Sequence, residues 1–334
     1  MFGIERNPGK VNEYLHLIDI KQHGFPNTFS VFLAEFNNGV VIIDCGTSKD
    51  VRKLLRYMKE NNISLDSVKY VIASHHHFDH SGGLWKLYDE IKKYNPRLKI
   101  ISSLETMNML NNFENEQHFV RSRETWPILM GKLKKIEEDA FKIINSDEYY
   151  KKEGESSNII DTFTLNDSEV GLAILETPGH APGHISPLFI KNDSVDFIYF
   201  GEALGSLNHS KKLETLPSSA APDFNYKNYM TSLKKIKELT PFSGGFAHFG
   251  FVSGLENVHA IIDDNEYITK DFRQRIIKLY REKPETKYIF DKLTPIAIPR
   301  VEIDVDEDSQ IYQTLIKFMV TVVYGMMMDL GYRT

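Results

Sequence analysis

Cysteine is almost absent from this chain of 334 residues, which contains Cys45 and no other. A disulfide needs two cysteines, and a structural zinc site of the usual kind needs several, so the sequence excludes both. Cys45 follows an apolar, β-branched segment, and we expect it to be a small buried apolar residue.

Long apolar runs and a strong net charge are also missing. The first eight residues contain no apolar signal segment, which predicts a cytoplasmic protein. The most apolar stretch, residues 311–330, is interrupted by polar side chains, whereas a membrane span normally needs about 20 residues with few or none, so we expect no membrane association. The formal net charge of −6 argues against a broad nucleic-acid-binding surface, and we expect a small-molecule substrate and no nucleic-acid partner.

One short stretch carries four candidate metal ligands within six positions. It reads Ser74-His75-His76-His77-Phe78-Asp79-His80-Ser81-Gly82-Gly83 and follows an apolar run, residues 68–73, that predicts a buried strand. Alternate side chains of an extended segment share a face, so His75 and His77 can hold one ion together, while His76 points away. Asp79 and His80 follow the bend and can face a neighbouring position. The pattern predicts a metal site at the end of a strand, because imidazole and carboxylate groups suit zinc, iron and related metals.

This motif resembles the signature of the metallo-β-lactamase-fold hydrolases, and further segments resemble the other motifs of that family in the same order. These segments are residues 41–46 (VIIDCG), 177–184 (TPGHAPGH), 200–202 (FGE) and 247–250 (AHFG). The resemblance extends over roughly residues 10–255, and the motifs are most similar to those of glyoxalase II and related thioesterases and lactonases. It implies an α/β fold: an αββα sandwich of two mixed β-sheets flanked by helices.

The resemblance also implies a role for each residue of the site. The implied ligands of a first ion are His75, His77 and His180. The implied ligands of a second ion are Asp79, His80 and His248. Glu202 would bridge the two ions, and Asp44 and His184 would support the ligands through hydrogen bonds.

Glu202 departs from the family pattern, which has aspartate at this position. The longer side chain can bridge two ions only if its loop shifts or the side chain folds back. Two alternatives remain open: Glu202 binds a single ion, or it is a partly exposed loop residue that only tunes the site. His209 lies in the following segment, where we expect a contact with substrate. The isolated histidines are predicted to be ordinary, partly buried residues: His16, His23, His118 and His259.

These features predict a metal-dependent hydrolase. Two divalent ions, zinc first and iron or manganese as alternatives, would lower the pKa of a bridging water and supply hydroxide. Asp79 and Glu202 would be the catalytic carboxylates, and the substrate would be a small ester, thioester, lactone or phosphodiester. Two other functions stay open on this fold: a mono-iron sulfur dioxygenase or related redox protein, and a non-catalytic metal-binding regulatory module.

The expected organisation is a catalytic domain over residues 1–255 and a mainly helical extension over 256–334. Within the domain, residues 113–153 are predicted to be a helical insertion with one apolar face: Leu129, Leu133, Ile136, Ala140 and Ile143. This insertion either packs on a sheet or forms a lid over the metal site. In the extension, the apolar helix over residues 311–330 is predicted to be buried or to form a homodimer contact.

Overall fold

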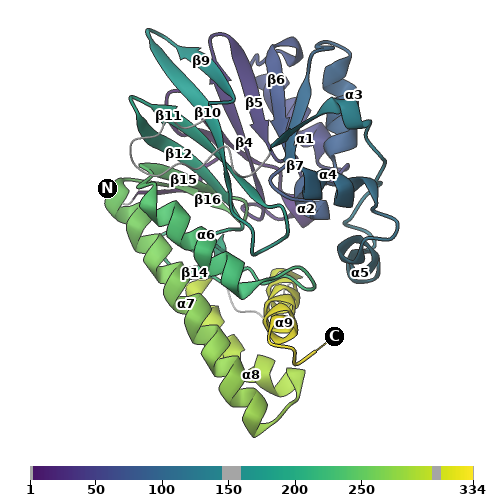
Figure 1. Ribbon diagram of the computed structural model, residues 1–334, viewed down its shortest axis with the longest axis vertical. Coiled ribbons are helices and arrows are strands. Elements are labelled where there is room, and N and C mark those ends of the chain that lie inside the picture. Colours follow the sequence, from purple (N-terminus) through teal and green to yellow (C-terminus); the bar gives the residue numbers. More distant parts are fainter. Residues whose placement is uncertain (1–2, 145–158, 303–309, 334) are drawn as a thin grey trace.

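The computed structural model describes residues 3–144, 159–302 and 310–333 of the chain. Two seven-stranded β-sheets pack face to face, and helices cover the outer side of each sheet (Figure 1). Each sheet contains both parallel and antiparallel pairs, for example β12 with β15 and β10 with β11. The predicted αββα sandwich of two mixed sheets is therefore confirmed.

The first sheet contains the N-terminal half of the chain. Its strands, in spatial order, are β2 (Gly9–Lys10), β3 (Leu15–Asp19), β4 (Ser30–Phe36), β5 (Gly39–Ile43), β6 (Val68–Ile72), β7 (Lys99–Ser103) and β8 (Phe141–Ile144). The first four form an antiparallel meander, and the last four are parallel. Parallel strands need long crossover connections, which here contain α1 (Val51–Glu60), α2 (Phe78–Ser81), α3 (Leu84–Lys92), α4 (Leu104–Asn111) and α5 (Gln117–Thr125).

The second sheet contains later strands and one short N-terminal strand. In spatial order they are β1 (Ile4–Glu5), β16 (Gly250–Ser253), β15 (Ser243–Phe246), β12 (Ser194–Gly201), β11 (Ile185–Lys191), β10 (Ser168–Glu176) and β9 (Asp161–Leu165). Helix α6 (Tyr226–Glu238) lies in the connection from β12 to its parallel neighbour β15. The same connection contains a two-stranded sheet of β13 (Ser206–Leu207) and β14 (Thr215–Leu216).

Phenylalanine side chains join the two sheets at the centre of the sandwich. The ring of Phe32 on β4 lies 5.4 Å from that of Phe197 on β12, and Phe36 lies 4.7 Å from Phe163 on β9. All four are buried. Each buried aromatic ring contributes about 1.5–3 kcal/mol by leaving water. This packing fixes the two sheets against each other and thereby brings their strand ends to one edge.

The predicted helical insertion over residues 113–153 is wrong for most of its length. Within its described part, residues 113–144, α5 is the one α-helix, residues 126–137 are loop, Glu138–Ala140 form a short 3-10 turn, and Phe141–Ile144 form β8 beside β7. Pro127 and Gly131 explain the difference, since proline is unfavourable within a helix and Gly131 has a φ of +71°. Apolar residues of this segment still pack on the core, Ile136 from a loop and Ala140 from the 3-10 turn. Residues 145–153 lie outside the described part.

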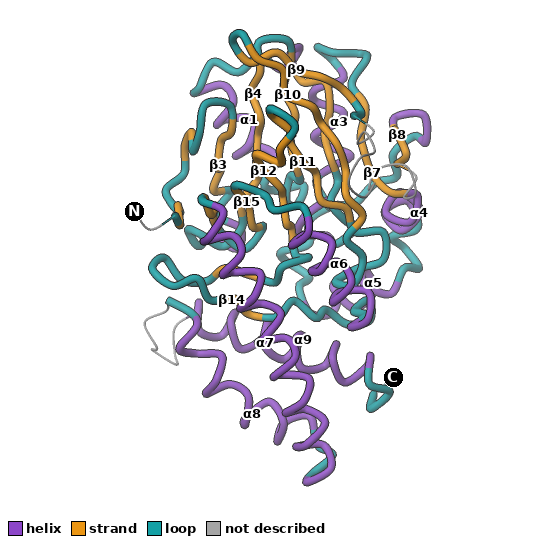
Figure 2. Tube along the Cα trace, turned by 60° about the vertical axis from the view of Figure 1, so that its left-hand side comes forward, coloured by secondary structure: helices purple, strands orange, loops and turns teal. Residues whose placement is uncertain are grey.

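The predicted C-terminal helices are confirmed as α7 (Leu255–Glu282), α8 (Thr286–Ala297) and α9 (Gln310–Asp329), which project below the sandwich (Figure 2). They share a second apolar cluster with α6, in which Met326 and Met327 of α9 are buried. This part of α9 packs within its own chain, and the homodimer contact stays a prediction. Across the described residues, no helix is both long enough and apolar enough to span a membrane.

Candidate metal centre

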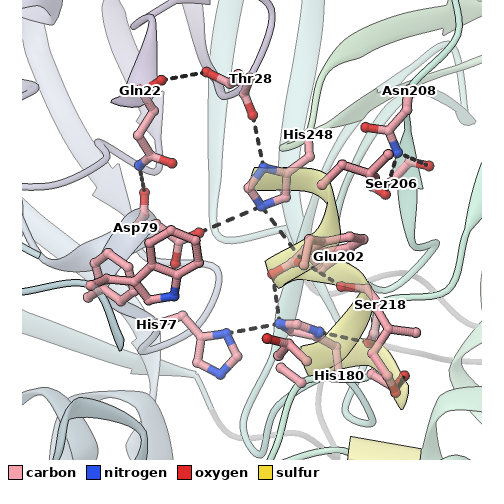
Figure 3. A pocket seen from close by; sticks show the side chains of 18 of the residues that line it. Gln22, Thr28, His77, Asp79, His180, Glu202, Ser206, Asn208, Ser218 and His248 are labelled. Atoms are coloured by element: carbon pink, nitrogen blue, oxygen red, sulfur yellow. Dashed lines mark hydrogen bonds and ion pairs between the residues drawn. The ribbon is translucent and has the colours of Figure 1, made fainter. Parts of the chain in front are cut away.

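The implied metal ligands come together at one edge of the sandwich, although they are distant in the sequence. Each follows the end of a strand: His75–His80 follow β6, His180 follows β10, Glu202 follows β12 and His248 follows β15. Figure 3 shows His77, His180, Glu202 and His248 directed toward one another with Asp79 beside them. The packing of the two sheets therefore assembles the site from four loops.

Two groups of side chains in this site can each hold a metal ion. One combines His75, His77, His180 and Glu202, and the other combines Asp79, His80 and His248. In each group the ligand atoms all lie within 4.8 Å of one another. The structure thus places together the residues that the sequence assigned to a first and a second ion.

Glu202 lies between the two groups. Its Oε2 atom is 2.7 Å from Nε2 of His180, 3.5 Å from Nε2 of His75 and 3.1 Å from Nε2 of His80. Its Oε1 atom accepts a hydrogen bond from Ser218 and is 3.8 Å from Nε2 of His248. The residue is buried, so the alternative of a partly exposed loop glutamate is wrong. Burial alone would raise the pKa of Glu202, but the charge of His180 and its contact with the carboxylate hold the pKa of Glu202 well below its usual range.

Three histidines are fixed through Nδ1 by an oxygen atom on the outside of the site. The pairs are His80 with Asp44 (2.8 Å), His180 with the carbonyl of Ser218 (2.9 Å) and His248 with the carbonyl of Thr28 (2.9 Å). An oxygen of this kind can only accept a hydrogen bond, so in each neutral ring Nδ1 donates and the lone pair is on Nε2. All three lone pairs therefore face the carboxylate of Glu202.

His77 is fixed in the opposite sense. Its Nε2 donates to Oδ2 of Asp223 at 3.1 Å, and its Nδ1 lies 3.0 Å from Nε2 of His180. The carboxylate of Asp223 thus leaves the lone pair on Nδ1, pointing into the group. We conclude that His77 would bind an ion through Nδ1, unlike His80, His180 and His248.

Among the implied metal ligands, two buried nitrogen atoms lack a hydrogen bond. They are Nε2 of His75 and Nε2 of His80, and neither has a hydrogen-bond partner among the described residues. An unsatisfied buried polar atom costs about 1–3 kcal/mol, and a metal ion removes this cost by accepting the lone pair. These nitrogens and the neighbouring carboxylates form a donor set that suits a divalent metal ion.

Asp44 supports the histidine-rich loop. It lies just after β5 with a φ of +59°, and its carboxylate accepts hydrogen bonds from Ser74 N, Ser74 Oγ and Tyr199 Oη, each at 2.8 Å. Burial alone would raise the pKa of Asp44, but the hydrogen bond and charge of His80 lower it below its usual range. Asp44 therefore stays ionised and holds the ring of His80 in place, consistent with the supporting role that the resemblance implies.

His184 supports the backbone of Glu202. Its Nδ1 lies 2.8 Å from Oγ1 of Thr177, and its Nε2 accepts a hydrogen bond from the backbone N–H of Glu202 at 3.3 Å. Burial lowers the pKa of His184 to about 3, so the ring is neutral. The preceding Gly201 has a φ of +56°, and a Cβ atom there would lie 2.7 Å from Nε2 of His184. Glycine is therefore needed to bring the two residues together.

Sequence reasoning missed two residues beside His77. The ring of His118 stacks on that of His77 at 3.8 Å and 9°, so the prediction of an isolated, partly buried histidine is wrong for His118. Oδ2 of Asp223 contacts both His77 and Nε2 of His76, the latter at 3.4 Å. No local pattern identifies either residue, because α5 and the loop before α6 bring them to the site only in the folded chain.

His76, His77, His118 and Asp223 also have ligand atoms within 4.8 Å of one another. A metal ion lies in the plane of each imidazole ring that binds it. The parallel stack of His77 and His118 prevents one ion from lying in both ring planes. We therefore interpret these residues as support for His77 and not as a further ion site.

Replacing Asp223 by alanine is expected to weaken binding of the ion held by His77. The variant loses the acceptor that fixes the tautomer, and loss of such a partner typically costs about tenfold to a hundredfold in metal affinity. Competition with a chromogenic zinc chelator measures this affinity. Asp89→Ala, on the exposed face of α3, is the matched control and should bind as the unmodified protein does. Equal affinities in both variants would show that Asp223 has no such role.

The metal centre opens into a cavity of about 620 Å³. Its wall includes His77, Asp79 and Glu202, together with side chains of α5 and α9. The substrate contact expected for His209 stays a prediction: its neighbour Asn208 lines the cavity, whereas His209 itself does not. Although most of the predicted insertion is not helical, its helix α5 lines this cavity. The proposed role of the insertion as a lid over the metal site stays a prediction.

The fold and the site together define a two-sheet α/β protein with a buried histidine and carboxylate cluster suited to divalent metal ions. Comparison of the sequence with known families agrees with this description. Residues 24–241 match the metallo-beta-lactamase superfamily, and the chain belongs to that superfamily.

Relatives of similar length are found among named proteins and solved structures. The chain is 28% identical to the metallo-beta-lactamase fold-containing protein ST1585 of Sulfurisphaera tokodaii, over 72% of this chain and 79% of that protein. It is 24% identical to the probable metallo-hydrolase YqjP of Bacillus subtilis, over 75% of this chain and 76% of YqjP. The crystal structure of ST1585 superposes with a TM-score of 0.62 at 22% identity, covering 94% of this chain and 98% of ST1585. These likenesses leave the substrate open.

Proposed function

We propose that this protein is a hydrolase that uses two divalent metal ions to cleave a small ester, thioester, lactone or phosphodiester. Zinc is the metal we expect at both sites. The position of Glu202 carries this proposal. Its Oε2 atom contacts His180 and His75 of one group and His80 of the other, as expected for a carboxylate shared by two ions. The similarity to YqjP, named a probable metallo-hydrolase, supports it.

When bound, the ions would lower the pKa of a water molecule toward neutrality and polarise the carbonyl or phosphoryl oxygen of the substrate. Glu202 would hold the nucleophilic water in line with the substrate through its carboxylate. Asp79 lies at the cavity, with a side chain 20% exposed and Oδ2 3.7 Å from Nε2 of His248. Its Oδ2 can accept the proton of the attacking water and return it to the leaving group.

A mono-iron dioxygenase fits the arrangement less well. Such enzymes bind one iron through two histidines and one carboxylate. A single ion would bind only some of the metal-ligating side chains in this site, and the group of Asp79, His80 and His248 would be left without an ion. Contact of Glu202 with both groups therefore favours two ions. The cavity beside the centre favours catalysis over a purely regulatory role.

Elemental analysis of the purified protein tests the proposal first. We expect about two zinc or manganese ions per chain, because the two groups offer separate sets of donors. A panel of esters, thioesters, lactones and phosphodiesters identifies which of them the protein hydrolyses. Removal of the metal with a chelator should abolish this hydrolysis, and added zinc should restore it. One iron per chain with oxygen uptake on a persulfide would instead identify a dioxygenase. Hydrolysis that survives complete removal of metal would overturn the proposal.

A further inference from the structure

We propose that the cavity binds a substrate with an apolar body and an anionic group, and that Arg121 binds the anion. This inference rests on the proposed hydrolase function and names the substrate class. The bond to be cleaved would lie at the metal centre, the body along α9 and the anion at α5.

The apolar part of the cavity is formed by the C-terminal helix. Leu315, Phe318 and Val322 of α9 line the cavity and are spaced three and four residues apart, so they share one face of the helix. Trp126, just after α5, adds an aromatic side chain. Apolar walls with a few polar groups are typical of small-molecule sites.

One face of α5 forms a second part of the wall. His118, Arg121, Ser122 and Thr125 line the cavity at helical spacing. The guanidinium of Arg121 donates to Sδ of Met328 at 3.6 Å and lies 6.0 Å from the centre of the Tyr324 ring. Sulfur is a weak acceptor, and a guanidinium has five N–H donors. Arg121 therefore keeps donors for a ligand.

Arg121 also has no carboxylate within 4.0 Å in the part of the chain that the structure describes. Arg6, which lines the same cavity, does have a carboxylate nearby: its guanidinium is 3.9 Å from Glu302 and donates to the carbonyl of Asn27, while its buried Nε has no partner among the described residues. The other acidic residues of the wall, Asp79 and Glu202, belong to the metal centre. Arginine binds carboxylate and phosphate groups in a bidentate manner, so an anionic group of the substrate would neutralise the positive charge of Arg121.

The size of the cavity agrees with a substrate larger than a simple acetyl ester. Its volume of about 620 Å³ falls within the range of about 300–1,000 Å³ that is usual for drug-sized ligands. The metal centre, α9 and α5 all line this one cavity, so a single substrate can contact all three.

Matched 4-nitrophenyl esters test the inference on the zinc-loaded protein. The octanoate ester is neutral, and the suberate hemi-ester has the same chain with a terminal carboxylate. We expect kcat/KM to be about tenfold to a hundredfold higher for the hemi-ester, in line with a hydrogen bond to a charged group. Arg121→Met should remove this preference by lowering kcat/KM for the hemi-ester to about the value for the octanoate ester, and Arg121→Lys should keep part of it. A phosphonate-ended ester shows whether phosphate is preferred to carboxylate.

Arg123→Met is the matched control. Arg123 lies on the same helix but outside the cavity, and its guanidinium bonds to the carbonyls of Phe113 and Glu114. This variant should keep the full preference for the hemi-ester. An equal kcat/KM for both esters in the unmodified protein, or a preference that survives in Arg121→Met, would overturn the inference.

Calorimetric binding separates this inference from the proposed function. Suberate should bind the zinc-loaded protein more tightly than octanoate, by about tenfold or more, and Arg121→Met should equalise the two. If no ester is hydrolysed but suberate still binds more tightly through Arg121, the hydrolase proposal fails and the binding site stands. If suberate and octanoate bind equally to the unmodified protein, the binding site fails whatever the activity.

Discussion

Replacing His180 by alanine is expected to abolish turnover while the sandwich stays folded. His180 contributes the nitrogen nearest to Glu202, at 2.7 Å, and also approaches His77 at 3.0 Å. Without it the first group loses one of its three imidazoles, so we expect one ion fewer per chain. Loss of a single electrostatic partner of a reacting centre commonly costs about a hundredfold to a thousandfold in rate, and loss of an ion should cost at least as much.

The structural cost of this change should be small in comparison. His180 lies in a loop after β10 and outside both apolar clusters, and its removal leaves the carbonyl of Ser218 without its donor. One such unpaired group costs about 1–3 kcal/mol of the free energy of unfolding. Circular dichroism should therefore show a folded protein. His259→Ala, on α7 and away from the metal centre, is the matched control and should keep both ions and full activity. Undiminished hydrolysis by His180→Ala would contradict the metal mechanism.

The histidine-rich motif could be interpreted from the sequence because its residues are close together along the chain. His75, His77, Asp79 and His80 fall within six positions after one strand, so local geometry already relates them. The resemblance to a family then placed His180, Glu202 and His248, which the structure brings to the same edge. Asp223 and Ser218 could not be predicted in this way. Both lie in the irregular loop before α6, and only tertiary packing decides what they contact.

The error over residues 126–144 has a similar physical origin. Apolar residues spaced three or four apart satisfy a helical pattern, but spacing alone does not show which backbone carries them to the core. Here a loop buries Ile136, a short 3-10 turn buries Ala140, and the pairing of Phe141 with Ile100 completes the edge of the first sheet. Pro127 and Gly131 were the local signals against a helix, and they outweigh the periodicity.

Replacing Glu202 by glutamine is expected to reduce the ion content from about two to about one per chain. Glutamine has nearly the same size and can still accept the hydrogen bond of Ser218, but it has no charge to share between two cations. Turnover should fall by about a hundredfold or more, since the nucleophilic water loses both an ion and its orienting carboxylate. Elemental analysis and kcat/KM on the same sample measure the two effects.

Two further variants separate the charge of Glu202 from its placement. Glu202→Asp keeps the charge and restores the residue that the family pattern has, so it should keep both ions if the carboxylate bridges them.

Ser218→Ala removes only the hydrogen bond to Oε1 and leaves the carboxylate among the histidines. It should keep both ions and lose about tenfold to a hundredfold in rate, because a single hydrogen bond to a charged group contributes about 1.5–3 kcal/mol. If Glu202→Ala kept two ions per chain, the bridging role would be refuted. Loss of one ion in Glu202→Ala and Glu202→Gln, but not in Glu202→Asp, would identify the negative charge at this position as what holds the second ion.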